Sequence, residues 1–203
     1  MFEIKKTEYR ENLESFAIAV LTILFIMVFI MRSFIVDGVS MEPTLLNRER
    51  LLVNKMVFHF RQPRTGDIVV IIPPGDPTRK YIKRVIAGPK QSIRIENSKV
   101  YVDGIELNEP YIKEKMTPEF YTGEVPDNAV FVMGDNRNNS TDSRVSSIVG
   151  FVPLKNVLGK AFFVFWPLGK LHYLADPKYI PVYDSSFSMP ESFGTGGSGI
   201  SGQ

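Results

Sequence analysis

The amino-terminal part of the chain contains an apolar run of membrane-helix length. The range Phe16–Met31 has sixteen residues without a charge, and Thr22 is its only polar residue. As a helix this run would rise about 24 Å, against a hydrocarbon core of about 30 Å. Extension to residues 16–36 gives twenty-one positions with Arg32 as the one charge, and an arginine near the end of a span can reach the headgroups. We therefore predict a transmembrane anchor over 16–36.

Two other interpretations of this run are weaker. A buried helix in a soluble protein normally has a polar face, and this run has none. A cleaved signal peptide needs a shorter apolar region and a cleavage site of the A-x-A type, which the stretch from Arg32 to Ser40 lacks. Charge alone leaves the orientation open, because three basic residues precede the run and three follow it closely.

Composition argues against several functional classes. The net charge is only +2 and the basic residues are interspersed with acidic ones, so no nucleic-acid-binding surface is expected. The chain has no cysteine, which removes disulfides, thiol catalysis and cysteine-based metal sites. Its two histidines, His59 and His172, form no HExxH motif, which argues against a histidine-rich metal site. We expect no metal.

The rest of the chain is rich in strand signals. Short segments of Val, Ile, Phe and Tyr are separated by Gly, Pro, Asn and Asp, without the alternation of strands and helices typical of α/β proteins. These patterns predict a mostly β fold of antiparallel sheets with long loops. Strands are expected at 51–60, 67–72, 81–87, 93–95, 100–102, 105–107, 130–133, 148–152 and 161–165.

Composition also indicates how the chain is divided. Residues 113–128 are polar and contain two prolines, which is typical of a surface excursion. At the carboxyl end, half of the last ten residues are glycine, so we expect disorder there. The predicted parts are a cytoplasmic segment 1–15, the anchor 16–36, an extracytoplasmic β-rich domain 37–184 and a disordered Gly/Ser-rich tail 185–203.

A serine close to the apolar run is a candidate nucleophile. Ser40 lies between Gly38 and Pro43, where the backbone is expected to bend. A serine needs a base to attack a carbonyl. Neither His59, within an apolar segment, nor His172, near the tail, has a catalytic context. An ordinary turn serine is the alternative interpretation of Ser40.

A lysine is the other possible base. Its pKa must fall from about 10.4 to around 7–8, which requires burial or a neighbouring positive charge. On an alternating strand, Lys83 shares its face with Tyr81, Val85 and Ala87, so burial is plausible there. A lysine at a strand edge that reaches solvent is the alternative.

A polar loop follows one apolar segment and precedes another. Residues 134–144 read GDNRNNSTDSR, a composition that favours turns held by side-chain hydrogen bonds. In such a loop Ser140 can orient a lysine amine, and Asp142 can pair with Arg144. An ordinary surface loop remains the alternative if this segment is considered alone.

Together, in this order behind an apolar segment, these pieces resemble the bacterial type I signal peptidases. The resemblance covers about residues 34–169 and has the short form of Gram-positive members, without a large inserted domain. Its most specific string is the polar loop. The matching strings are SMEPTL at 40–45, GDIVV at 66–70, YIKRVIA at 81–87 and GDNRNNSTDSR at 134–144.

The resemblance assigns a role to each of these residues. It implies that Ser40 is the nucleophile and Lys83 the general base, with Ser140 hydrogen-bonded to Lys83. Asp142 with Arg144 would support the loop. Gly38 stands where some members carry a serine whose hydroxyl donates to the oxyanion. Glycine also occurs there in Gram-positive members, and the second donor would then be a backbone group or water.

The resemblance also implies a reaction and a location. The family consists of membrane-bound serine endopeptidases that remove signal peptides from exported preproteins after a small-x-small, Ala-x-Ala-like site. Such an enzyme would cross the plasma membrane once, with a cytoplasmic amino terminus, and would need no cofactor or metal. Its partners would be signal peptides and plasma membrane lipid.

A signal peptide is expected to bind as an extended strand along edges near 34–38 and 79–83. Its small side chains would then enter shallow apolar pockets that exclude larger groups. By similarity, those pockets are lined by Phe34, Val36, Met41, Leu45, Leu51, Val70, Tyr81 and Ile82.

Two rival hypotheses stay open. One is another Ser-Lys peptidase, such as a self-cleaving repressor or an enzyme of pilus assembly. The other is a non-catalytic, membrane-anchored β domain that binds extended peptides. The presence of Ser40, Lys83 and Ser140 within family strings argues against the second.

Overall fold

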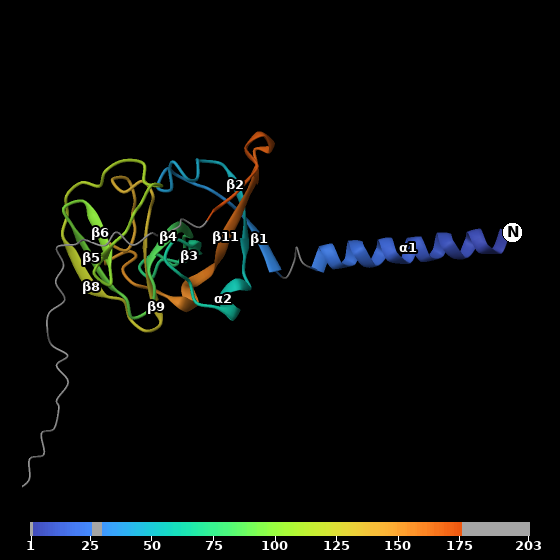
Figure 1. Ribbon diagram of the computed structural model, residues 1–203, viewed down its shortest axis with the longest axis horizontal. Coiled ribbons are helices and arrows are strands. Elements are labelled where there is room, and N and C mark those ends of the chain that lie inside the picture. Colours follow the sequence, from blue (N-terminus) through green and yellow to red (C-terminus); the bar gives the residue numbers. More distant parts are fainter. Residues whose placement is uncertain (1, 26–29, 176–203) are drawn as a thin grey trace, which may run out of the picture.

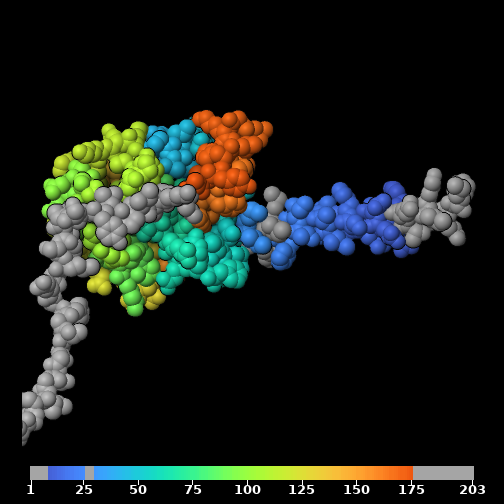
Figure 2. Space-filling view, viewed as in Figure 1, coloured from blue at the N-terminus to red at the C-terminus, as the bar shows by residue number. Residues whose placement is uncertain are grey.

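The computed structural model describes residues 2–25 and 30–175, with side chains from residue 9 onward. Helix α1 (Phe2–Phe25) projects away from a body of antiparallel sheets (Figure 1). Figure 2 shows the same division between the long helix and the rounded β domain. The expectation of a mostly β, antiparallel fold is confirmed. The predicted tail 185–203 lies outside the described residues.

The predicted anchor 16–36 is described only in part, because its residues 26–29 lie outside the described residues. Every described side chain of α1 is exposed, including large apolar ones such as Phe16 and Leu21. Within residues 2–25 and 30–175, none of the helices combines the length and apolar character that crossing a membrane requires. Residues 31–35, predicted as the end of the anchor, instead form strand β1, because their backbone pairs with β2 in the large sheet.

The larger sheet has eight strands and carries the candidate site. Its order is β1-β2-β11-β3-β4-β9-β10, and β12 pairs with β11. All of its pairings are antiparallel. Its strands are β1 (Met31–Ile35), β2 (Arg50–Asn54), β3 (Ile68–Ile71), β4 (Tyr81–Ala87), β9 (Ala129–Met133), β10 (Val152–Pro153), β11 (Val157–Trp166) and β12 (His172–Tyr173).

A second sheet of four strands lies at the end of the β domain opposite to α1 (Figure 1). Its order is β7-β6-β5-β8, with the β6–β7 turn formed by Asp103 and Gly104, both at positive φ. Glycine suits such a turn because it adopts positive φ without a steric penalty. The strands are β5 (Ser92–Glu96), β6 (Lys99–Val102), β7 (Ile105–Glu106) and β8 (Tyr121–Glu124), and the short helices of the chain are α2 (Val57–Phe60), η2 (Leu154–Asn156) and η3 (Leu168–Lys170).

Two expected strands have wrong bounds, and one expected surface segment contains a strand that was not predicted. The strand predicted over 51–60 ends at Asn54, whose side-chain oxygen accepts hydrogen bonds from the next turn's amides and starts the bend into α2. The segment 113–128, predicted as a surface excursion, is mostly exposed, and it also contains β8, which pairs with β5. The strand predicted over 148–152 begins only at Val152, because the preceding residues form turns on the Val145 carbonyl.

The site rests on strands that are buried over most of their length. All four residues of β3 and the last five of β4 are buried, so this part of the sheet is covered on both faces. Apolar side chains from the Ser40 turn, including Met41 and Leu45, pack with Val70 of β3 in one core cluster. The turn is therefore attached to the sheet by apolar packing as well as by hydrogen bonds.

Candidate active site

Ser40 begins a turn that follows β1, and another loop holds its backbone. Asn136 donates its backbone amide to the Ser40 carbonyl at 3.0 Å and its side-chain amide to the Val39 carbonyl at 3.1 Å. Gly38 has φ +104°, a conformation that favours glycine, and its amide donates to Asn47 Oδ1 at 3.1 Å. The turn is thus shaped by one glycine and held in place by the 134–144 loop.

Lys83 extends from β4 to the serine. Its Nζ lies 2.7 Å from Ser40 Oγ, and the lysine is only 4% exposed. Burial lowers the pKa of this amine to about 8, although the Asp142 and Asp135 carboxylates oppose the shift and Arg144 adds to it. A hydrogen bond between a serine hydroxyl and a lysine amine with this pKa is the arrangement that a lysine base requires.

The predicted hydrogen bond between Ser140 and Lys83 is absent. Ser140 Oγ is buried, yet no described residue is its hydrogen-bond partner. The Lys83 amine bonds instead to Ser40. Ser140 packs against Gly134, where a Cβ would meet the Ser140 side chain and would lie 2.5 Å from the Ser40 carbonyl oxygen. Position 134 therefore requires glycine because the loop passes so close to the nucleophile turn.

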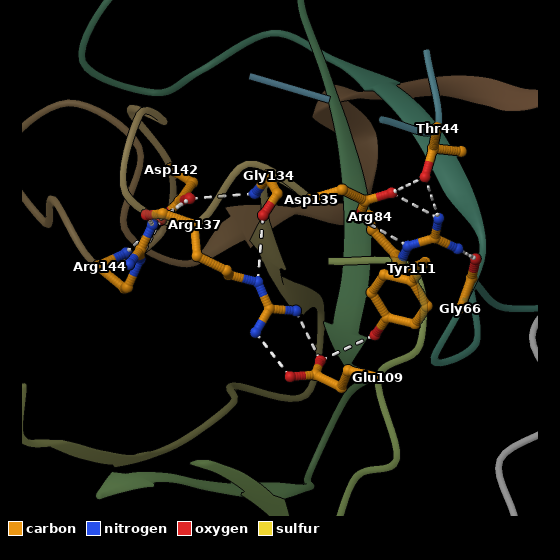
Figure 3. Close-up of polar contacts among 10 residues, drawn as sticks. All are labelled: Thr44, Gly66, Arg84, Glu109, Tyr111, Gly134, Asp135, Arg137, Asp142 and Arg144. Carbon is orange, nitrogen blue, oxygen red and sulfur yellow. Dashed lines mark hydrogen bonds and ion pairs between the residues drawn. The ribbon is translucent and has the colours of Figure 1, made fainter. Parts of the chain in front are cut away.

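Asp142, which is buried, and Arg144, which is partly buried, form an ion pair inside the loop. Asp142 is fully buried and accepts hydrogen bonds from Arg144 Nε at 2.8 Å and from the Gly134 amide at 3.0 Å (Figure 3). Arg144 also donates to the Arg137 carbonyl at 2.6 Å and to Glu119 at 2.9 Å. The pair therefore links the start of the loop to its end.

A second buried pair, which the sequence analysis missed, joins the three parts of the site. Arg84, next to Lys83 on β4, donates to both carboxylate oxygens of Asp135, at 2.6 and 2.8 Å (Figure 3). Thr44, in the serine turn, donates to the same carboxylate at 2.5 Å. The available signal was a second cation beside Lys83 in an otherwise apolar strand, since such a charge needs a partner if it is buried.

A cleft of about 380 Å³ opens onto Ser40 and Lys83. Of the predicted pocket residues, Phe34, Val36, Met41, Val70, Tyr81 and Ile82 line it. Leu45 and Leu51 do not line it. Both are fully buried in the core cluster beneath, because they pack against β3 and β11 rather than facing the opening. Lining residues that the sequence analysis missed are Ile35, Asp37, Val39, Lys80, Asn139 and Thr141.

The two walls of the cleft have free backbone edges. On β4, pairing with β9 begins only at Arg84, so residues 81–83 pair with β3 on one side alone. On the other wall, β1 is the first strand of the sheet, and among the described residues it pairs with β2 alone. An extended peptide can add to such edges through its backbone. No group of three or more metal-ligand side chains occurs in the part of the chain that the structure describes.

Comparison with known proteins gives consistent matches. The family profile described as "Signal peptidase, peptidase S26" matches residues 9–166. "Probable signal peptidase I-1" from Synechocystis sp. is 39% identical over 179 residues, covering 85% of this chain and 90% of the relative. "Signal peptidase I S" from Bacillus subtilis is 38% identical over 178 residues, covering 82% of this chain and 94% of the relative. A crystal structure of a signal peptidase I from Enterococcus faecalis V583 aligns with 49% of this chain and 97% of its own, at 28% identity and a TM-score of 0.43.

The profile match includes every part of the site. It begins within α1 and ends at the last residue of β11, so it contains the serine turn, β4 and the 134–144 loop. The two named relatives match along nearly their whole length. The chain belongs to the signal peptidase family, peptidase S26.

Proposed function

We propose that this protein is a membrane-tethered serine endopeptidase that removes signal peptides from exported preproteins, with Ser40 as nucleophile and neutral Lys83 as general base. One observation carries the assignment of these two residues. The buried Lys83 amine lies 2.7 Å from the Ser40 hydroxyl. Among relatives, proteins named signal peptidase I supply the substrate class.

The mechanism follows from the protonation of Lys83. With a pKa of about 8, roughly one lysine in ten is neutral at pH 7, against fewer than about one in a thousand for a free lysine. Neutral Lys83 removes the Ser40 proton as the serine attacks the scissile carbonyl. The lysine then gives this proton to the leaving amine, and later activates the water that hydrolyses the acyl-enzyme.

The developing oxyanion needs hydrogen-bond donors close to Ser40. The Ser40 amide is available, since no described residue accepts a hydrogen bond from it. The Gly38 amide already donates to Asn47. We therefore assign the first oxyanion donor to the Ser40 amide, and a water or another backbone amide supplies the second.

The substrate would bind as an extended strand between the two walls of the cleft. Its backbone would pair with the free edges of β1 and of residues 81–83. The large side chains of Phe34, Tyr81 and Ile82 form part of the cleft walls. They leave room only for small substrate side chains where the peptide lies closest to Ser40. This geometry favours a small-x-small sequence before the scissile bond.

The tether would be the apolar run that includes the second half of α1. Its large apolar side chains are exposed along the helix, and such side chains gain free energy when they leave water. A tether places the cleft near membrane-bound substrates and raises their effective concentration. We place the amino terminus in the cytoplasm and the β domain outside, where exported preproteins emerge.

The test is cleavage of an Ala-x-Ala reporter preprotein in membranes that contain the full chain. Ser40→Ala and Lys83→Met should each abolish cleavage, while the protein remains folded by circular dichroism. The double variant should be no worse than either single one, because the two residues act as a unit. Near-normal processing by Lys83→Met would show that another group is the base.

A further inference from the structure

The segment from Glu109 to Lys113 lies between β7 and β8 and contacts all three parts of the candidate site. Its alternate residues Glu109, Tyr111 and Lys113 each contact a different element. These elements are the 134–144 loop, strand β4 and the serine turn. None of the three residues lines the cleft. We call residues 109–113 the brace.

Glu109 holds the loop through Arg137. The two terminal nitrogens of Arg137 donate to the two Glu109 oxygens at 2.6 and 2.5 Å (Figure 3), and Arg137 is only 2% exposed. Arg137 Nε also donates to the Gly134 carbonyl at 3.1 Å. The residue before Arg137 is Asn136, which holds the carbonyls of Val39 and Ser40. A chain of contacts therefore runs from Glu109 to the backbone of the nucleophile.

Tyr111 supports the strand that carries the base. Its ring centre lies 3.9 Å from the Arg84 guanidinium carbon, close enough for a cation–π contact. Its hydroxyl donates to Glu109 at 2.8 Å. Asp135 binds the Arg84 guanidinium through hydrogen bonds, and the Tyr111 ring packs against it as well. Since Arg84 is the neighbour of Lys83, both contacts help to fix the strand that carries the base.

Lys113 reaches the nucleophile turn. Its backbone amide donates to the Asp135 carbonyl at 3.1 Å, and its Nζ lies 2.7 Å from Glu42 Oε2. Glu42 is two residues after Ser40. Its partner Glu42 keeps 22% of its side chain exposed, so removal of Lys113 leaves no fully buried charge without a partner. This contact can therefore be broken with little effect on the core.

We propose that the brace sets the distance and angle between Ser40 and Lys83, so that Glu109, Tyr111 and Lys113 are positioning residues for catalysis; this inference rests on the proposed function. The geometry of a nucleophile and its base affects the rate steeply, since a displacement of about 1 Å can cost roughly a hundredfold. Because the brace lies outside the cleft, its loss should lower kcat and leave KM unchanged.

The experiment compares four variants of the full chain with the parent, measuring kcat and KM on an Ala-x-Ala peptide reporter below the melting temperature of each. Lys113→Met should lower kcat about three- to fivefold, as expected for an exposed ion pair. Tyr111→Leu should lower it about tenfold or more. Tyr111→Phe keeps the ring over Arg84 and should stay within about threefold of the parent.

Lys99→Met is the matched control. The Lys99–Glu106 pair has a length of 2.8 Å and exposed fractions of 49% and 26%, against 2.7 Å and 45% and 22% for Lys113–Glu42. It lies in the small sheet, between β6 and β7. The kcat of Lys99→Met should equal that of the parent. An equal loss in Lys99→Met and Lys113→Met would overturn the proposal, because the effect would then be general to surface charge.

The remaining outcomes separate the brace from the proposed function. Unchanged kcat in both Lys113→Met and Tyr111→Leu would overturn the brace while leaving the Ser40–Lys83 assignment intact. A raised KM with unchanged kcat would also overturn it, since the segment would then act on substrate binding. A reporter that the parent leaves uncut, or that Ser40→Ala still cuts, would refute the proposed function, and the brace with it.

Discussion

In the candidate site, Lys83 and four other charged side chains are at most 4% exposed. In the small sheet, by contrast, the ion pairs lie at the surface. The buried five are Lys83, Arg84, Asp135, Arg137 and Asp142. In the small sheet, the pair Lys99–Glu106 is partly exposed on both sides. The interior of that sheet is apolar instead, with Ile93, Ile95, Val100 and Val102 buried against Phe131.

Charged residues therefore have different roles in the two parts of the domain: buried ones position the site, and those of the small sheet form surface pairs. Removing ions from water costs several kcal/mol each, which their mutual attraction offsets only with good geometry. Exposed pairs cost little and contribute about 0–1 kcal/mol. The small sheet therefore obtains its stability from apolar packing. The buried charges instead hold Ser40, Lys83 and the loop in one arrangement, and replacing buried ion pairs by apolar residues often leaves stability unchanged or raises it.

The largest effect expected from this comparison is in Asp142→Ala. This change leaves Arg144 without its buried partner and removes the acceptor of the Gly134 amide. The free energy of unfolding should fall by about 3–5 kcal/mol, measured by urea denaturation. Glu106→Ala, which breaks a pair of the small sheet, should cost no more than about 1 kcal/mol. Equal losses of unfolding free energy in Asp142→Ala and Glu106→Ala would contradict the distinction between buried charges at the site and surface pairs in the small sheet.

Lys83→Met should stabilise the protein while abolishing its activity. The folded pKa of about 8 lies below the unfolded value of about 10.5, so at neutral pH the buried ammonium costs about 3 kcal/mol. Between these values the unfolded chain binds the extra proton, and parental stability rises with pH. Denaturation at pH 7 and pH 10 should show this rise in the parent, and Lys83→Met should lack it. Lys99→Met, the surface control, should keep it.

A glycine in each region gives the smallest expected difference. Gly134→Ala would place a Cβ 2.5 Å from the Ser40 carbonyl oxygen, and overpacking of this kind costs about 1–3 kcal/mol. Because the clash is with the nucleophile turn, peptidase activity should fall as well. Gly104→Ala has free space but a φ of +79°, so it should cost about 1 kcal/mol with unchanged activity. Thermal melts and reporter assays of both variants measure the contrast.

Much of the fold was accessible from local patterns. Strand β4 has the bounds predicted for it, 81–87, because its short run of mostly apolar residues and the turn residues before it are local signals. The strand predicted over 51–60 was too long because the Asn54 side chain accepts hydrogen bonds from the amides of Met56 and Val57 and ends the strand. The pattern of apolar residues gives no sign of such hydrogen bonds. The same limit applies to residues 31–35, where a partly apolar sequence that contains Arg32 suits both the end of a membrane helix and a sheet edge.

The site was only partly accessible. The resemblance of the Ser40 and Lys83 strings to a known family indicated a nucleophile and a base, and the loop composition allowed an internal ion pair. The hydrogen bond of Ser140 and the pocket-lining positions of Leu45 and Leu51 were predicted wrongly, because elements far away in the chain decide whether a side chain faces a cleft or the core. The brace was not predicted, since polar residues outside regular structure give no signal of what they contact.

The sequence alone determined the apolar run, the short strands, the absence of thiol chemistry and the residue types of the site. These follow from composition and from periodicity within a few neighbouring residues. Only the tertiary structure decided that Ser40 Oγ meets Lys83 Nζ, 43 residues later, and that Arg84 meets Asp135, 51 residues later. Such contacts depend on strand register and loop paths, because a shift of one residue along a strand turns each side chain to the opposite face.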